Sequence, residues 1–318
     1  MNRRYRLLNG GRKRMKQSLT RRQFLKTTAI GAAAAYLSPS AIGGTSPVLA
    51  EDLKQRVIIG SHRNLVDASE QIVPKIVRAV VDDTLVALTN TASARDAWLQ
   101  LLPNLQSHDV IGIKVNCINR RQSSHPPVVY ALAESLIESL DFNPNHLLIW
   151  DRTSRELKRA HYTINTGKTG VRCLGTSDGI GYDESFAVDV GNDREVHLSK
   201  ILTEMCTYLI NVPVLKDHGI AGITLSLKNH YGSIDRPGVC HGGGCDPYAA
   251  HLNATPHIKD KTALILCDAL FGIYRGGPGG SPQWINRQLL ASVDPVALDY
   301  TGMTIIDHQR QQRNISLA

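Results

Sequence analysis

The sequence lacks several features that would assign its function directly. The apolar stretch of residues 29–37 is too short and too rich in alanine to form a membrane span of roughly 20 residues. Neither glycine cluster, at residues 238–244 or 276–280, fits a phosphate-binding fingerprint, and no serine nucleophile elbow is present. These absences argue against P-loop and dinucleotide-binding fingerprint enzymes and against serine α/β-hydrolases.

Acidic residues are also absent before Glu51, whereas residues 1–26 hold ten Lys or Arg. Within this basic region, residues 20–26 (TRRQFLK) resemble the twin-arginine export signal. An alanine-rich stretch follows, and residues 48–50 (VLA) offer small side chains to a signal peptidase. A basic arm that binds nucleic acid is the alternative, but the ordered RR-x-F-L-K pattern favours a signal. We therefore expect residues 1–50 to be a cleaved signal peptide read by the twin-arginine export machinery.

Removal of the leader changes the charge of the chain. The full sequence has a net charge of 36 − 28 = +8, and the leader alone carries +10, so residues 51–318 carry 8 − 10 = −2. The basic isoelectric point therefore indicates no nucleic-acid partner. The remaining 318 − 50 = 268 residues are enough for a single α/β domain. The resemblance implies a protein exported already folded, to the periplasm or another extracytoplasmic location, with no stable membrane span after cleavage.

The pattern of apolar residues predicts strands and helices in alternation. Strand, helix and strand in succession favour right-handed crossovers, so the predicted fold is α/β, a mostly parallel central sheet flanked by helices, with an antiparallel hairpin addition. The expected strands are residues 57–59, 110–115, 146–150, 208–212 and 263–267; the expected helices are 69–83, capped by Ser69, then 94–102, 127–140, 154–160 and one opened by Asp294; and the hairpin pairs 186–190 with 196–198.

Polar clusters follow the strand of residues 208–212, which Pro213 is expected to end. The first cluster contains Lys216 and His218, and the second begins at Lys228. A charged pair after a strand is often only a solvated turn. However, four expected strand ends carry polar residues, and ligands of open α/β sheets bind outside the carboxyl ends of strands.

These positions give the candidate site. Cations suit an anionic ligand, and histidines or acids can move a proton, with His218 or His230 expected to exchange one near neutral pH. The candidate catalytic residues are Lys114, Asp151, Lys216, His218, Lys228, His230 and Asp268, and the candidate substrate-binding residues are Asn116, Arg152, Asn211, Asn229 and Asp294. Of these, Lys114, Asp151, Lys216, Lys228 and Asp268 are predicted to converge on one cleft.

A second candidate is the glycine-rich loop of residues 237–247, in which no regular element is expected. Its candidate metal ligands, of the types that bind zinc or iron, are Cys240, His241, Cys245 and, further along, His251. Their spacing is neither that of a zinc finger nor that of a ferredoxin. A metal ion, an iron–sulfur cluster, a Cys240–Cys245 disulfide and unpaired thiols all stay open.

Seven segments together resemble the bacterial and archaeal family catalogued as domain of unknown function 362. They are residues 114–116 (KVN), 149–152 (IWDR), 211–218 (NVPVLKDH), 226–232 (SLKNHYG), 268–270 (DAL), 276–278 (GGP) and 294–299 (DPVALD). The resemblance spans residues 57–306 and supports the location of the site. Some relatives carry ferredoxin-type cysteine runs and are described as iron–sulfur proteins, and this chain lacks that run.

Two functions follow from these observations. The first is an exported enzyme that acts on a small anionic substrate at the carboxyl edge of the sheet, with a metal or iron–sulfur link left open. The alternative is a non-catalytic periplasmic protein that binds or delivers a metal or cofactor. The enzyme needs Lys216 or Lys228 against its substrate, whereas the carrier needs chiefly cysteine and histidine.

Overall fold

The computed structural model describes residues 34–36 and 53–318. The expected twin-arginine motif and the expected cleavage point after Ala50 lie outside these residues. Within the described part of the chain, no helix has the length and apolar character needed to cross a membrane.

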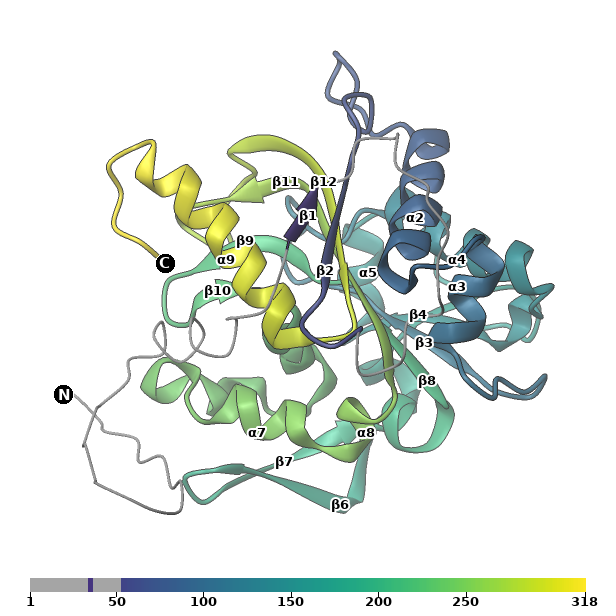
Figure 1. Ribbon diagram of the computed structural model, residues 1–318. Coiled ribbons are helices and arrows are strands. Elements are labelled where there is room, and N and C mark those ends of the chain that lie inside the picture. The colour runs from purple at the N-terminus through teal and green to yellow at the C-terminus, as the bar shows by residue number, and fades with distance from the viewer. Residues whose placement is uncertain (1–33, 37–52) are drawn as a thin grey trace, which may run out of the picture.

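A central sheet runs through the molecule in the order β1-β2-β12-β11-β8-β3-β4-β5, and β9 and β10 extend beside β11 (Figure 1). Most neighbouring pairs are parallel, while β12 is antiparallel to both β2 and β11. The strands are β1 (Ala34–Tyr36), β2 (Val57–Ser61), β3 (Ile111–Lys114), β4 (Leu147–Asp151), β5 (Arg172–Gly175), β8 (Tyr208–Asn211), β9 (Val214–His218), β10 (Gly222–Thr224), β11 (Thr262–Ile273) and β12 (Trp284–Ser292). The predicted mostly parallel α/β sheet is confirmed.

Four helices cover one face of the sheet, and Figure 1 shows α2, α3 and α4 grouped on the same side. They are α2 (Pro74–Thr89), α3 (Ala94–Leu101), α4 (Pro126–Leu140) and α5 (Ser154–Arg159). Ile111 and Ile113 of β3 pack into this layer, because alternate strand residues point to the same face. Leu148 and Trp150 of β4 belong to the core on the opposite face.

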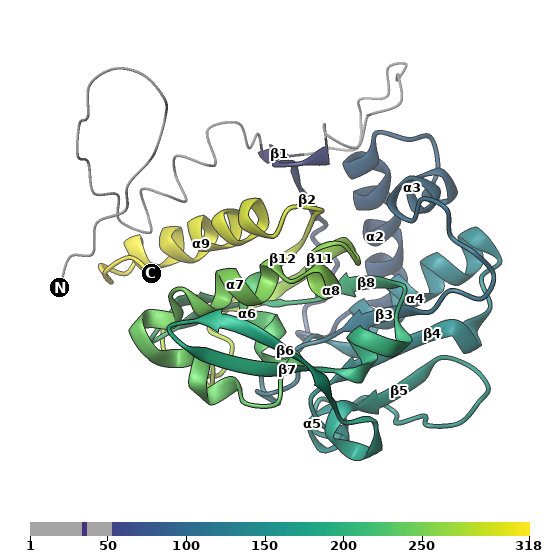
Figure 2. The same cartoon turned by 90° about the horizontal axis from the view of Figure 1, so that it is seen from below.

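The opposite face is covered by two groups of elements. Helix α9 (Pro295–Gln311) packs on β2, β9, β11 and β12. The antiparallel hairpin β6 (Tyr182–Gly191) and β7 (Arg194–Ser199) covers the other end with α7 (Tyr248–Ala254) and α8 (Pro256–Lys259), and Figure 2 shows the hairpin beside α7. The predicted antiparallel hairpin is confirmed, with longer strands than expected.

The first long helix begins later than its pattern indicated. Ser69 does not cap it; its backbone amide donates instead to Asp67 Oδ1, in a turn before the helix. The helix begins at Pro74, which stands at the first helical position, where a missing N–H group costs no hydrogen bond. The proline regarded as a weak point inside the helix is therefore its start.

Two strand ends also differ from the prediction. Pro213 does not end strand formation, since the chain re-enters the sheet as β9, so Lys216, Asp217 and His218 lie in a strand. Asp268 is not past the end of its strand either, because β11 continues to Ile273. Asp268 stands where the neighbour of β11 changes from β8 to β9.

Candidate functional site

A buried ion pair joins the carboxyl ends of the neighbouring strands β3 and β4. Lys114 Nζ donates to Asp151 Oδ1 over 2.7 Å and to the carbonyl oxygen of Val115 over 2.7 Å. The backbone amides of Cys117 and Arg152 donate to the two carboxylate oxygens of Asp151 over 2.6 and 2.8 Å. Each charge of this pair is therefore compensated inside the protein, as buried charges require.

A chain of amide side chains lies beside this pair. Lys216 Nζ donates to Asn116 Oδ1 over 2.6 Å. Asn116 Nδ2 donates to Asn229 Oδ1 over 2.9 Å, and Asn229 Nδ2 donates to Asn211 Oδ1 over 2.7 Å. Asn211 Nδ2 lies 3.3 Å from His230 Nε2. We call the following buried group the inner network: Lys114, Asn116, Asp151, Asn211, Lys216, Asn229 and His230.

Lys216 differs from Lys114 in its partners. Its side chain is fully buried, and its ammonium group is held by two neutral oxygens, Asn116 Oδ1 and the carbonyl oxygen of Gln122 at 3.0 Å. Burial lowers the pKa of Lys216 to about 8, because desolvation outweighs the attraction of the more distant acidic groups, among them Asp151. The site therefore contains one neutralised lysine and one lysine with neutral hydrogen-bond partners.

A second group, the outer cluster, lies around Lys228 and consists of His218, Lys228, Tyr231, His241 and Cys245. Lys228 Nζ lies 3.0 Å from His241 Nε2 and 3.8 Å from the centroid of the Tyr231 ring. The rings of His218 and His241 are stacked with centroids 5.8 Å apart. Burial lowers the pKa of Lys228, and the thiols of Cys245 and Cys240 counteract part of that shift.

Helix α6 (Ser226–Asn229) and the 3₁₀ turn His230–Ser233 connect the two groups. Lys228 belongs to the outer cluster, while the next two residues, Asn229 and His230, belong to the inner network. Asp299 of α9 holds the start of this segment, because its carboxylate accepts hydrogen bonds from the Ser226 amide over 2.7 Å, the Ser226 hydroxyl over 2.5 Å and the Leu227 amide over 3.2 Å. One short helix thus positions side chains of both groups.

The histidines of the site do not titrate where the sequence indicated. Burial, with a contribution from Lys228, lowers the pKa of His218 to about 4. Burial and Lys114 lower the pKa of His230 to about 3. Both rings are therefore neutral at pH 7, and the expectation that one of them exchanges a proton near neutral pH is wrong.

The family comparison covers this whole region. The family described as Domain of unknown function (DUF362) matches residues 111–304, a segment that includes every residue of the inner network and of the outer cluster. This match extends over more than half of the chain. The chain belongs to the DUF362 family.

Other comparisons add little to the DUF362 assignment. No curated protein matches the chain. Among solved structures, it is similar to a protein from Thermotoga maritima known from a structural genomics crystal structure, at 12% sequence identity and a TM-score of 0.43. That similarity covers 68% of this DUF362 chain and 58% of the Thermotoga chain.

The remaining predicted site residues of the DUF362 chain lie in other settings. Arg152 pairs with Glu156 of α5. The Asp294 carboxylate caps α9, accepting from the amides of Val296 and Ala297 over 2.8 and 3.0 Å. Asp268 pairs with His125 rather than with a lysine. Their roles toward a ligand stay predictions.

The predicted metal ligands are only partly brought together. Within residues 34–36 and 53–318, no three His, Cys, Asp or Glu side chains are grouped so as to hold a metal ion. Cys240 and Cys245 are both buried free thiols, so the disulfide alternative is not formed in this structure. Their loop includes a short 3₁₀ segment, Pro237–Cys245, interrupted at Gly242–Gly244, where no regular element was expected.

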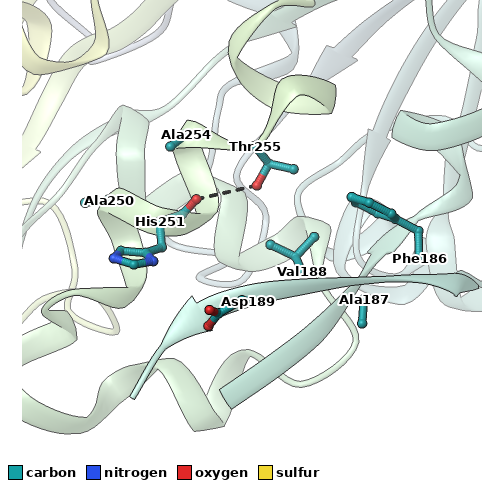
Figure 3. A pocket seen from close by; sticks show the side chains of 8 residues that line it. All are labelled: Phe186, Ala187, Val188, Asp189, Ala250, His251, Ala254 and Thr255. Carbon is teal, nitrogen blue, oxygen red and sulfur yellow. Dashed lines mark hydrogen bonds between the residues drawn. The ribbon is translucent and has the colours of Figure 1, made fainter. Parts of the chain in front are cut away.

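His251 lies apart, on a surface groove between β6 and α7 (Figure 3). The groove has a volume of about 470 Å³, and its sides are formed by β6 and by α7 with the residue that follows it. Its lining residues are Phe186, Ala187, Val188, Asp189, Ala250, His251, Ala254 and Thr255. No member of the inner network lines this groove.

Two further features near Lys216 were missed by sequence reasoning. His125, the residue before α4, binds Asp268. The loop between β3 and α4 is also tied to the glycine-rich loop before β12, because Asn119 Nδ2 donates to the carbonyl oxygens of Pro278 and Gly280 over 2.8 and 2.7 Å, and Arg121 donates to that of Gly279 over 2.7 Å. The only sequence signal was their place shortly after an expected strand end.

Proposed function

We propose that this DUF362 protein is an exported enzyme that binds a small anionic substrate between Lys216 and Lys228 and transforms it by proton transfer. The observation that carries the proposal is the neutrality of the partners of both lysines. Lys216 donates to an amide oxygen and a backbone carbonyl, and Lys228 lies against an imidazole nitrogen and a tyrosine ring. No carboxylate of residues 34–36 and 53–318 lies within ion-pair distance of either ammonium group.

A buried cation is costly unless an opposite charge or strong hydrogen bonds compensate it. An anion bound between the two lysines would supply that charge and would raise the pKa of each, since a nearby negative charge favours the ammonium form. Lys114 does not have this role, because Asp151 already neutralises it. The amide chain from Asn116 to Asn211 would orient the polar atoms of the ligand.

Lys216 is also suited to exchange a proton. Its pKa of about 8 leaves a fraction of neutral amine near neutral pH, whereas an exposed lysine would be almost fully protonated. Acid–base groups work best when their pKa lies near the working pH. Export is proposed from the arginine pair of residues 21–22 and the alanine-rich stretch that follows it.

The proposal is tested by calorimetric titration of inorganic phosphate and of short carboxylates. In Lys228→Met, we expect binding to weaken roughly 10- to 100-fold, the value of a lost charge-assisted hydrogen bond. In Lys216→Met, binding should also weaken, while the free energy of unfolding without ligand stays unchanged or rises, because an apolar side chain replaces a costly buried cation.

Lys168→Met is the matched control, since Lys168 is an exposed lysine outside both groups. Equal binding by the wild type and both site variants would refute the proposal. A Cys240→Ser, Cys245→Ser double variant separates the rival carrier function, which would lose its ligand with the thiols and keep it with the lysine variants.

A further inference from the structure

The strongest unassigned feature is the pair formed by His125 and Asp268. Asp268 Oδ2 lies 2.7 Å from His125 Nδ1 and accepts a hydrogen bond from the His125 backbone amide over 2.8 Å. The other carboxylate oxygen accepts from the Leu270 amide over 3.2 Å. The carboxylate is therefore fixed by its own backbone and holds the histidine at two points.

The two faces of the imidazole ring differ. Asp268 has no exposed side-chain surface, whereas the His125 side chain is 21% exposed. The ring lies against Phe271, with centroids 5.4 Å apart. Within the part of the chain that the structure describes, His125 Nε2 has no hydrogen-bond partner, so this nitrogen is left for a ligand.

This pair lies next to Lys216 through Gln122, which precedes His125 by three residues. The Gln122 carbonyl oxygen accepts from Lys216 Nζ, and Gln122 Nε2 donates to the carbonyl oxygen of Phe271 over 2.9 Å. The Gln122 side chain is fully buried, yet its Oε1 has no partner among the described residues. A buried acceptor of this kind is suited to a donor group of a bound ligand.

We propose that His125 and Asp268 are the proton-transfer pair of this site, acting on an anion held at Lys216. The inference rests on the proposed function. With Nδ1–H directed at the carboxylate, His125 Nε2 has a free electron pair that takes a proton from the substrate. The substrate keeps the bonding electrons, Asp268 stabilises the resulting imidazolium, and the same proton returns to the product, so that no external oxidant or reductant is needed.

The electrostatic environment agrees with this role. Burial opposes the charged form of His125, but the charge and hydrogen bond of Asp268 outweigh burial and Lys216, so the pKa of His125 is raised. The other titratable groups that act on Asp268 are Tyr162 and Cys267, and burial raises the pKa of both, so they are neutral at pH 7. His125 thus differs from His218 and His230, which do not charge near neutral pH.

The chain offers an internal control, the pair of His197 and Asp235. His197 Nδ1 lies 3.1 Å from Asp235 Oδ2, its backbone amide donates to Asp235 Oδ1 over 2.9 Å, and its side chain is 26% exposed. In both pairs a carboxylate holds the imidazole and the backbone amide of one histidine. Only the His125 pair adjoins Lys216.

The test is a ¹⁵N NMR titration of the histidine rings, with and without inorganic phosphate, in wild type, Asp268→Asn and Asp235→Asn. We expect Asp268→Asn to lower the proton affinity of His125 at least tenfold and Asp235→Asn to leave it unchanged. Phosphate should raise the proton affinity of His125 severalfold in the wild type and not in Lys216→Met, while His197 stays constant.

The outcomes separate the two proposals. Phosphate that binds by calorimetry without moving the His125 titration overturns this inference and leaves the anion site standing. Absence of any anion binding overturns the proposed function and this inference with it. If Asp268→Asn does not fold, His125→Gln decides, because it should retain phosphate binding but abolish the proton uptake that accompanies it in the wild type.

Discussion

Gly232 lies against the Lys114–Asp151 ion pair so closely that no other residue fits. A Cβ atom at this position would stand 2.8 Å from Asp151 Oδ1 and 2.8 Å from Lys114 Nζ. Both partners are buried and held by further hydrogen bonds, so neither can move away cheaply. The glycine in the segment of residues 226–232 is thus required by the packing of the inner network.

Gly232→Ala should therefore lower the free energy of unfolding by about 1–3 kcal/mol, the usual cost of overpacking a buried site. Urea denaturation measures this value, and Gly238→Ala is the control, since a Cβ atom there would contact nothing within 4 Å. A Gly232→Ala protein as stable as Gly238→Ala would contradict the described packing.

Single residues of the site were predictable only where strand ends reveal them. Lys114 and Asp151 follow from apolar runs that stop at a polar residue, and parallel strands bring such ends to one edge. Burial and partners were not predictable, so the sequence could not distinguish Lys114 from Lys216 or show that His218 and His230 stay neutral. His125 escaped notice because the loop after β3 is long and periodicity carries no signal there.

At the scale of elements, α6 depends on a carboxylate from α9. Asp299 is buried, and burial raises its pKa to about 7, although the hydrogen bonds from Ser226 and Leu227 act in the opposite direction. A carboxyl group with a raised pKa in the folded state binds its proton more tightly there than in the unfolded chain. Its protonation therefore stabilises the fold, and that stabilisation is lost as pH rises from about 4 to about 7.

We predict that the stability advantage of the wild type over Asp299→Asn shrinks between pH 4 and pH 8, because asparagine cannot take up the proton. Urea unfolding of both proteins at several pH values measures this difference, and contributions from all other groups cancel in the comparison. An advantage that grows with pH would show that Asp299 is ionised in the folded protein throughout this range.

The elements themselves were predicted more successfully than their ends. Periodicity placed α3, α4 and the main strands within about a residue or two of their observed bounds. It failed at β9, because Pro213 interrupts the apolar pattern although the chain continues in the sheet, and at Asp268, because β11 exchanges one neighbour for another without ending. Both failures concern pairing between distant segments, which a local pattern does not contain.

At the scale of the whole molecule, the proposed export route predicts a dependence on Arg21 and Arg22. Replacing both by lysine should retain the protein in the cytoplasm with its leader intact, whereas wild-type protein should be found outside the cytoplasm beginning at Glu51. Cell fractionation with N-terminal sequencing tests this, and mature double-lysine protein in the periplasm would contradict it. Lys13→Arg keeps the charge outside the motif and serves as the control.

The ties from Asn119 and Arg121 to residues 278–280 have a kinetic consequence for any ligand of the inner network. Lys216 has no exposed surface, so a ligand reaches it only during intervals when these backbone hydrogen bonds are open. Association would then be limited by the opening frequency of the two loops, and its observed rate would level off as ligand concentration rises. A bound anion would leave equally slowly, so a modest affinity at this site is compatible with a long residence time.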